Sequence, residues 1–305
     1  MLNRRKLWLD GKLVPFGRAK VHIMSHSFCR GSAIFEVMSL HDTAWGTAVF
    51  RLDEHIKRLQ RSASMVRMKL PYSGKKIKDA VLETVRSNRV RQGMIKLMCY
   101  YGGVEFEVIP RDPVVSMAVV VADPAKDLGS ARFNKGMRKP AELTIGEYRK
   151  WDPATFPVEA KSAASYLPGM VAKMDAIDKG FTGPILLDTK GFLAEGPTES
   201  LFLVKNGVLK TPALGNVLSG ITRMTVLELA EDIGIDTVEK KIRPAELMTA
   251  DEVFVTSSIV KIWSVCRVED KTLQAPGPIT ELLDKSMEKI LTGKVKGYKK
   301  WFNAA

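Results

Sequence analysis

A lysine among small side chains is the first candidate for chemistry. Lys161 lies in the segment Val158-Glu159-Ala160-Lys161-Ser162-Ala163-Ala164-Ser165-Tyr166, after an expected strand. When such a lysine is shielded from water, its pKa falls, and the free amine can form a Schiff base with a carbonyl group. An exposed surface lysine fits the same segment when it is considered alone, so the assignment depends on accompanying groups.

Two further segments offer groups that bind phosphate. The segment Leu218-Ser219-Gly220-Ile221-Thr222-Arg223 is expected to open a helix through a glycine turn. Backbone N–H groups and the positive end of the helix dipole bind anions at such a position. Thr256-Ser257-Ser258 follows an expected buried strand and supplies more hydroxyl and amide donors. A plain helix cap and an ordinary turn are the alternatives for these two segments taken separately.

A carboxylate completes this group of side chains. Glu195 ends an expected strand at the Gly196-Pro197 turn. Held there, it could pair with a protonated ring nitrogen and so keep the ring of a cofactor electron-withdrawing. The sequence contains no G-x-G-x-x-G, P-loop or G-x-S-x-G signature. The amine of Lys161, the phosphate-binding donors of the two segments and the carboxylate of Glu195 together predict a phosphorylated, electron-withdrawing cofactor.

Composition describes an ordinary globular chain. The 305 residues are 45% hydrophobic and 27% charged, which excludes disordered, collagen-like and coiled-coil classes. No apolar run is long enough for a membrane span, and no apolar stretch of a signal peptide follows the basic N-terminus. We therefore expect a cytoplasmic protein without a membrane partner. The three cysteines are widely spaced, which indicates reduced thiols, and the pair His22 and His26 lacks the intervening Glu of a zinc hydrolase, so no metal is expected.

The net charge of +13 leaves one alternative that is not an enzyme. A basic surface attracts polyanions, so the chain could be a nucleic-acid-binding protein on a degenerate enzyme scaffold. The lysines are densest in the tail, at 285–300, but no aromatic platform or zinc finger accompanies them. A solvated tail is therefore the simpler interpretation, and no specific nucleic-acid partner is expected.

The elements that must position these groups form two mixed halves. In the first half, Asp10-Gly11 predicts a hairpin turn, and Asp53 is expected to cap a helix that extends to Met68. A second helix is expected after Ser73. Apolar runs predict strands at 94–101 and 114–121.

The second half is expected to be a strand-rich barrel or sheet decorated with helices. Strands are predicted at 184–188, 192–195, 200–205, 208–210 and 252–256, and helices at 222–233, 245–248 and 279–291. Prolines and glycines between the halves predict a boundary. The expected organisation is a small α+β domain at 1–125, an interdomain linker at 126–137 and a larger domain at 138–305.

In their order and spacing, these segments resemble the fold type IV pyridoxal-phosphate enzymes, especially the branched-chain amino acid aminotransferases. The resemblance covers nearly the whole chain, and the segments that carry it are Leu7–Lys12, Val21–His26, Phe35-Glu36, Phe50–Leu59, Lys161, Glu195, Leu218–Arg223 and Asp251–Ser258. It implies a two-domain α/β (α+β) fold with a small α+β domain and a larger barrel-like domain. It also implies pyridoxal 5′-phosphate as cofactor and a homodimer.

The resemblance implies a role for each matching residue. Lys161 would hold the cofactor as a Schiff base and carry the proton during transamination, while Glu195 would hold the pyridinium and Tyr166 the phenolic oxygen. The residues that would bind the phosphate are Arg51, Ile221, Thr222 and Ser258, with Ser257 contacting cofactor and substrate. The implied reaction transfers the amino group of an amino acid to a 2-oxo acid, expected to be 2-oxoglutarate.

Several positions depart from the branched-chain pattern. Arg30 stands where Tyr is usual, and Lys96 stands in Met94-Ile95-Lys96-Leu97 where Tyr-x-Arg-Pro is common. Ser200 replaces a usual Asn, and Lys261 a usual Glu. These departures indicate a changed substrate pocket around an intact cofactor site.

The substrate residues are therefore predicted to be Phe35, Arg30, Lys96 and Ser257. Two cations near one pocket would favour substrates with a second carboxylate, because a buried cation is costly until an anion neutralises it. Phe35-Glu36-Val37-Met38 also resembles the D-amino acid aminotransferases, and aminodeoxychorismate lyases share the scaffold. Both activities stay open as alternatives.

Overall fold

The computed structural model describes residues 2–129 and 139–305 and divides into two compact units. The first unit comprises Met1–Met137, Ala160–Ala164 and Lys289–Ala305, and the second comprises Arg138–Glu159 and Ser165–Glu288. Most of the predicted linker, its residues 130–137, lies outside the described residues, so the linker stays a prediction. No helix within the described ranges is long and apolar enough to cross a membrane.

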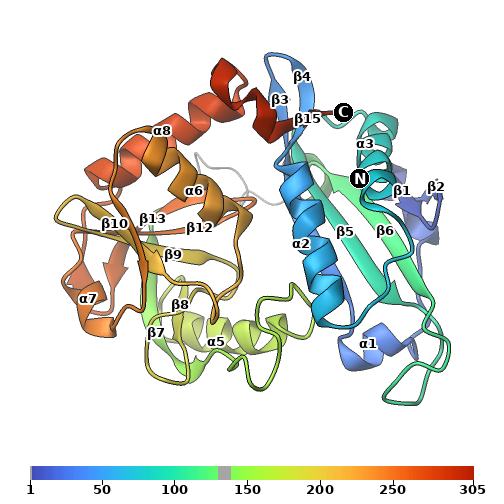
Figure 1. Ribbon diagram of the computed structural model, residues 1–305, viewed down its shortest axis with the longest axis horizontal. Coiled ribbons are helices and arrows are strands. Elements are labelled where there is room, and N and C mark those ends of the chain that lie inside the picture. Colours follow the sequence, from blue (N-terminus) through green and yellow to red (C-terminus); the bar gives the residue numbers. More distant parts are fainter. Residues whose placement is uncertain (1, 130–138) are drawn as a thin grey trace. The chain divides into compact units, whose positions relative to one another are not determined.

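The first unit is built on a seven-stranded sheet with two long helices on one face (Figure 1). In spatial order its antiparallel strands are β15 (Phe302–Ala304), β4 (Gly46–Phe50), β3 (Ile34–Thr43), β5 (Gly93–Tyr101), β6 (Val115–Ala122), β1 (Lys6–Leu9) and β2 (Lys12–Pro15). Its helices are α1 (His26–Arg30), α2 (Leu52–Met65), α3 (Gly74–Asn88) and α4 (Pro124–Leu128). The apolar stripe of α2 packs on β3 and covers Ile34 and Met38, whereas α3 packs on β1 and β6.

The predicted elements of the first half are confirmed with one correction. Asp10 and Gly11 both have positive φ in the β1–β2 turn, as a tight hairpin requires, and Ser73 accepts the capping hydrogen bond of α3 from Lys76 N–H. Asp53, however, is not the cap of α2. The cap is Arg51, in a left-handed conformation, because the main chain of Arg51 is bound by the distant Trp301.

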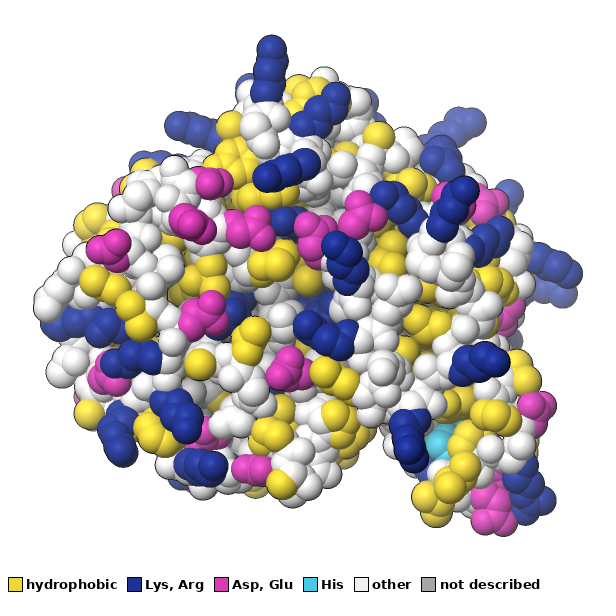
Figure 2. Space-filling model, viewed as in Figure 1, with side chains coloured by type: hydrophobic (Ala, Val, Ile, Leu, Met, Phe, Trp, Pro, Cys, Tyr) yellow, Lys and Arg dark blue, Asp and Glu magenta, His cyan; other side chains and the backbone are white. Residues whose placement is uncertain are grey.

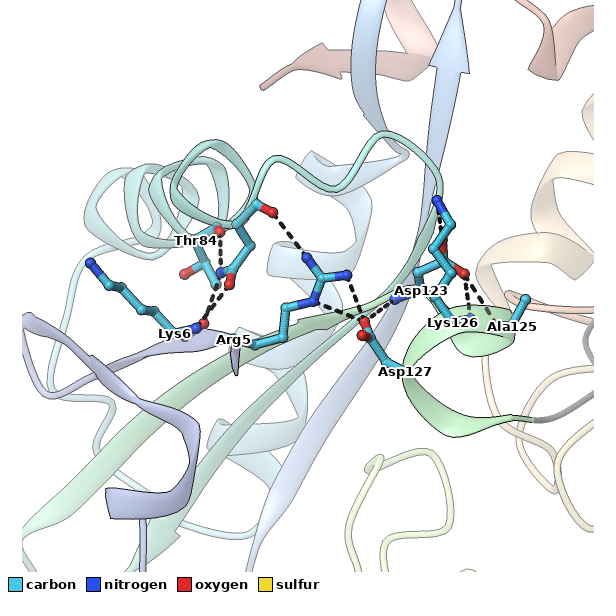
Figure 3. A network of polar contacts seen from close by, with 8 residues as sticks. Arg5, Lys6, Thr84, Asp123, Ala125, Lys126 and Asp127 are labelled. Atoms are coloured by element: carbon cyan, nitrogen blue, oxygen red, sulfur yellow. Dashed lines mark hydrogen bonds and ion pairs between the residues drawn. The ribbon is translucent and has the colours of Figure 1, made fainter. Parts of the chain in front are cut away.

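A polar network ties the N-terminal segment to α3 and α4 (Figure 3). Arg5 donates hydrogen bonds to the Asp127 carboxylate at 2.9 Å and to the Asn88 carbonyl at 3.0 Å. The Asn88 side chain binds both main-chain groups of Lys6, and Asp123 caps α4 through its carboxylate. These contacts fix the start of β1 and the point where β6 ends.

The second unit contains an eight-stranded sheet of mixed direction. Its main path is β11 (Thr237–Lys240), β10 (Val208–Pro212), β9 (Ser200–Lys205), β12 (Glu252–Ser257), β13 (Lys261–Val268), β7 (Ala141–Arg149) and β8 (Gly183–Leu187), and β14 (Lys271–Thr272) pairs with β13. The helices are α5 (Tyr166–Asp178), α6 (Ile221–Asp232), α7 (Pro244–Met248) and α8 (Pro278–Leu291). The predicted elements of this half are thus confirmed, except for one strand.

The predicted strand at 192–195 does not form. Leu193 donates its N–H to the Ile242 carbonyl and Ala194 donates to the Leu186 carbonyl, but these hydrogen bonds do not continue into a ladder with either neighbour. Only isolated bridges remain, one of which joins Glu195 to Ser200. This segment therefore passes across the edge of the sheet and ends with Glu195 beside the start of β9.

Candidate active site

In the first unit, the backbone around Lys161 is fixed by β3 and α2. The carbonyl of Lys161 accepts a hydrogen bond from Phe35 N–H at 3.0 Å, and its N–H donates to the Ser62 hydroxyl of α2 at 3.0 Å. Ala163 N–H donates to the Ala33 carbonyl at 2.7 Å, so the segment runs beside the start of β3. The main chain that carries Lys161 is therefore held from both sides.

The ammonium groups of two lysines lie over one aromatic ring. Nζ of Lys161 is 4.9 Å, and Nζ of Lys96 is 5.1 Å, from the centre of the Phe35 ring. Lys96 on β5 faces Val37 across the ladder, so Lys96 and Phe35 share the sheet face opposite α2. The structure thus brings together Lys161 and two of the predicted substrate residues by cation–π contacts.

On the other face of β3, the buried Glu36 carries a charge into the core. Its carboxylate accepts hydrogen bonds from Arg58 at 2.8 and 2.6 Å, and its Oε2 lies 2.7 Å from His55 Nδ1. Burial alone would raise the pKa of Glu36, but the charge and hydrogen bonds of Arg58 and the contact with His55 lower it to about 2. Arg58 and His55 were not predicted as site residues, although their spacing of three residues on a helix places them side by side.

The two predicted arginines have different surroundings. Arg51 is buried at the N-terminus of α2, where its Nη1 donates to Glu54 at 2.9 Å. Arg30 is exposed at the end of α1, and it donates to the carbonyls of Phe106 and Glu107 in the loop after β5. The hydrogen bonds of Arg30 therefore go to this loop.

In the second unit, one end of the β9–β12 pair collects most of the predicted cofactor residues. Ser200 lies opposite Thr256 in the ladder, and Glu195 bridges to Ser200. The chain before α6 approaches the same point, because a Cβ on Gly220 would stand only 2.6 Å from the Ser200 hydroxyl. Three groups of predicted residues thus adjoin the same strand ends. They are Glu195, the first turn of α6 with Ile221 and Thr222, and the turn with Ser257 and Ser258.

These groups fit a phosphate and a ring nitrogen. The cap of α6 is Gly220, which carries no side chain to accept the N–H groups of the first turn. The buried Thr256 hydroxyl, beside Ser257, has no hydrogen-bond partner among the residues that the structure describes. The N–H groups of the first turn of α6 and the Thr256 hydroxyl can donate hydrogen bonds to phosphate oxygens. The Glu195 carboxylate can accept a hydrogen bond from a protonated ring nitrogen. The donor set therefore fits pyridoxal phosphate.

Glu195 is held by two groups that were not predicted from the sequence. Its carboxylate forms an ion pair with Lys150 and accepts a hydrogen bond from Leu218 N–H at 3.1 Å. Tyr166 is the first residue of α5, and a Cβ on Gly169 of this helix would stand only 3.2 Å from Pro197 in the turn after Glu195. A small pocket adjoins this place, lined in part by Lys150, Trp151, Val158, Ser165, Pro168 and Gly196. Only spatial contact could reveal the role of Lys150, because nothing local in its sequence marks it.

Lys261 adds a buried cation to the same end of the sheet. It begins β13 with a φ of 58°, and its ammonium donates to the Ser258 carbonyl. Burial lowers the pKa of Lys261 to about 7. A group of three or more metal-ligating side chains is not found in 2–129 and 139–305.

The chain is similar to known proteins along almost its entire length. A family model for amino-transferase class IV matches residues 33–268. A branched-chain-amino-acid aminotransferase of Pseudomonas aeruginosa is 32% identical over 297 residues, which cover 97% of this chain and 95% of that protein.

Solved structures are also similar to this chain along almost its entire length. The branched-chain aminotransferase of Thermoproteus uzoniensis, solved with norvaline, superposes with a TM-score of 0.92 at 32% identity and covers 98% of both chains. The T.th. branched-chain amino acid aminotransferase, complexed with N-(5′-phosphopyridoxyl)-L-glutamate, superposes with a TM-score of 0.91 at 28% identity. That comparison covers 100% of this chain and 99% of the other.

Proposed function

Because the chain belongs to the class IV aminotransferases, we propose that it transfers the amino group of a branched-chain amino acid to 2-oxoglutarate. The predicted family, the mixed α/β fold and transamination by a pyridoxal-phosphate enzyme are confirmed. The observation that carries the proposed substrate is the similarity to branched-chain enzymes over 97% of the chain. The glutamate adduct in the T.th. enzyme structure supports 2-oxoglutarate as the acceptor.

Lys161 is the proposed catalytic residue. When bound, pyridoxal phosphate supplies an aldehyde and an electron-withdrawing ring. The Lys161 amine would hold the cofactor covalently, and after its release it would take the proton from the substrate Cα and deliver it to C4′ of the cofactor. The hydrogen bonds from Phe35 N–H and to Ser62 fix the main chain of Lys161, so its amine returns to the same place in each cycle.

Glu195 and Tyr166 are proposed to bind the ring of the cofactor. The Glu195 carboxylate would accept a hydrogen bond from the protonated ring nitrogen, and Lys150 and Leu218 N–H would orient that carboxylate. Tyr166, at the start of α5, would donate to the phenolic oxygen. These roles rest on the match of each residue to the family pattern.

The phosphate is proposed to lie at the N-terminus of α6. The main-chain N–H groups of Ile221 and Thr222 and the hydroxyls of Ser257 and Ser258 would donate to its oxygens, and Arg51 would supply a positive charge. Ser257 would also contact the substrate.

Lys96 is proposed to bind the distal carboxylate of 2-oxoglutarate. Its ammonium shares the Phe35 ring with Lys161 and is exposed, so a carboxylate can approach it. Lysine gives a point charge without the two parallel hydrogen bonds of arginine, and we therefore expect weaker discrimination for 2-oxoglutarate. Phe35 would contact the apolar side chain of the substrate, and Arg30 stays a predicted substrate residue.

Reduction with borohydride tests the covalent step. The purified protein should be yellow, and borohydride should fix the cofactor to the peptide that contains Lys161, as detected by mass spectrometry. The Lys161→Ala variant should lose this label, whereas Lys57→Ala, at an exposed position of α2, should keep it. A colourless protein that cannot be reconstituted with pyridoxal phosphate would contradict the assignment.

A half-reaction screen of L- and D-amino acids tests the substrate. Leucine, isoleucine, valine and glutamate in their L forms should discharge the cofactor, as followed by its absorbance. Preferential reaction of D-amino acids would favour the D-amino acid aminotransferase alternative. Formation of pyruvate from aminodeoxychorismate would favour the lyase alternative.

We also propose a homodimer that acts in the cytoplasm. In the first unit, hydrophobic side chains gather in the lobe formed by α1 and the loop after β5 (Figures 1 and 2). In that loop, Val104, Phe106, Val108 and Ile109 are 57–78% exposed. Exposed apolar patches of this kind mark interaction surfaces.

The three free cysteines support the proposed location in the cytoplasm, because thiols stay reduced in that compartment.

The second unit carries another exposed apolar stripe, on α5. Leu167, Met170, Met174 and Ile177 follow helical spacing and are 53–61% exposed. Light scattering at micromolar concentration should give twice the chain mass, and Phe106→Asp or Met174→Glu should lower it. Met248→Glu, at a partly exposed position of α7, is the control. A wild-type monomer would contradict the proposed dimer.

A further inference from the structure

The C-terminal segment packs onto the residue that precedes α2. The short helix η5 (Lys296–Trp301) leads into β15, which pairs with β4 so that Phe302 lies opposite Phe50. This pairing brings Trp301 against Arg51, although 250 positions separate the two residues in the sequence. Both residues are 3% exposed.

Trp301 contacts both the main chain and the side chain of Arg51. The Trp301 carbonyl accepts a hydrogen bond from Arg51 N–H at 2.6 Å. The guanidinium carbon of Arg51 lies 3.8 Å from the centre of the indole ring. Neither contact is explained by burial of apolar surface alone, because the first fixes the backbone and the second orients a charge.

The backbone of Arg51 needs such support. Its φ of 55° is left-handed, a conformation that is unfavourable for a residue other than glycine. The hydrogen bond to the Trp301 carbonyl offsets part of this cost. The ring of Trp301 is in turn held by Phe50 at 6.0 Å and by Tyr298 at 4.4 Å between ring centres.

We propose that Trp301 is a positioning residue: it holds Arg51 in the orientation that binds the phosphate of the cofactor, so the C-terminal segment contributes to cofactor affinity. The proposal rests on the proposed phosphate-binding role of Arg51. The indole contacts the face of the guanidinium, whereas arginine binds phosphate through N–H groups at its edge, so both interactions are compatible. Glu54, at 2.9 Å from Nη1, restrains one edge of the same group.

Comparison of two cofactor forms tests the proposal. Pyridoxal forms the same covalent bond as pyridoxal phosphate but lacks the phosphate, so the ratio of their dissociation constants isolates phosphate binding. In the apoenzyme, Trp301→Leu should weaken binding of pyridoxal phosphate about tenfold while changing pyridoxal binding less than about twofold. Trp301→Phe, which keeps an aromatic face, should lose only about threefold.

The Phe302→Leu variant is the matched control. Phe302 lies in the same C-terminal segment and packs on Phe50 and Trp45, so its loss disturbs packing without removing the ring over Arg51. The ratio of dissociation constants should stay at the wild-type value in this variant. Thermal unfolding of each apoenzyme verifies that it folds. Should Trp301→Leu fail to fold, the ratio measured with Trp301→Phe decides the test.

A double variant separates this proposal from the role of Arg51. Once Arg51→Gln is in place, adding Trp301→Leu should cause no further loss of phosphate-dependent affinity. An equal loss for pyridoxal and pyridoxal phosphate, or an unchanged ratio in both Trp301 variants, would show that Trp301 only stabilises the fold and would overturn the proposal. An Arg51→Gln variant with wild-type affinity for pyridoxal phosphate would instead refute the phosphate-binding role of Arg51 itself.

Discussion

The carboxylate of Glu36 and the guanidinium of Arg58 form a buried ion pair with two hydrogen bonds, at 2.8 and 2.6 Å, between β3 and α2. Glu36 is next to Phe35, whose ring lies on the opposite face of the strand with Lys96 and Lys161. The pair therefore anchors the stretch of β3 that presents Phe35.

Loss of Arg58 should be strongly destabilising. In Arg58→Met the carboxylate of Glu36 would stay buried without its main counter-charge, which costs about 3–5 kcal/mol of unfolding free energy. Urea unfolding at pH 7 measures this change. The double variant Glu36→Gln/Arg58→Met should recover part of the loss, because no charge is then left in the core. A single variant within about 1 kcal/mol of wild type would contradict the buried-pair argument.

The same pair predicts sensitivity to acid. The pKa of Glu36 is lowered to about 2, below its value of about 4.3 in the unfolded chain, so the folded state binds fewer protons between these values. Its contribution to stability is present above pH 4.3 and is lost as the pH falls toward 2. The difference in unfolding free energy between wild type and Glu36→Gln should therefore shrink over this range. If this difference in unfolding free energy stayed constant between about pH 4.3 and about pH 2, the lowered pKa of Glu36 would be refuted.

Gly31→Ala should disturb the segment that carries Lys161. Gly31 has a φ of +66°, and an added Cβ would stand 3.2 Å from the Cβ of Ala164. The left-handed conformation alone costs about 1–2 kcal/mol, and the contact pushes on the chain three residues after Lys161. We expect reduced kcat and a lower unfolding temperature. Gly17→Ala, where a Cβ meets nothing within 4 Å and φ is not positive, should change neither.

Lys261→Met should stabilise the protein in a manner that depends on pH. The folded pKa of about 7 lies below the unfolded value of about 10.4, so the folded state binds fewer protons in this window. The destabilising effect of Lys261 is greatest below pH 7 and fades as the pH rises toward 10.4. The increase in unfolding free energy caused by Lys261→Met should therefore be larger at about pH 6.5 than at about pH 9.5, as measured by chemical unfolding. A gain that grows with pH would contradict the buried, desolvated ammonium.

Lys96→Met should impair the reaction with the amino acceptor, 2-oxoglutarate, more than the reaction with the amino donor. If the ammonium over Phe35 binds the distal carboxylate, the variant should raise KM for 2-oxoglutarate about tenfold and leave that for leucine nearly unchanged. Steady-state kinetics with each substrate varied separately provide the values. Equal losses toward leucine and glutamate would mean that Lys96 is structural and would refute the proposed carboxylate site.

Most helices and strands, the family and the candidate site residues could be predicted from local patterns in the sequence. Apolar periodicity and turn residues are local properties, so the β1–β2 hairpin, the cap at Ser73 and the buried strand β12 follow from a few neighbouring positions. The motifs around Lys161, Glu195 and Leu218–Arg223 are contiguous too, and their order along the chain is specific.

Features that depend on contacts between distant segments of the chain could not be predicted in this way. The helix after β4 begins at Leu52 and not after Asp53 because Trp301 binds Arg51. Residues 192–195 do not form a strand because they make only isolated bridges, to Leu187 and Ser200, and no continuous ladder. The pairing of Lys150 with Glu195 likewise joins residues on different elements. Such contacts arise only when the chain has folded, because hydrogen bonds and ion pairs depend on distance in space and leave no periodic trace in the sequence.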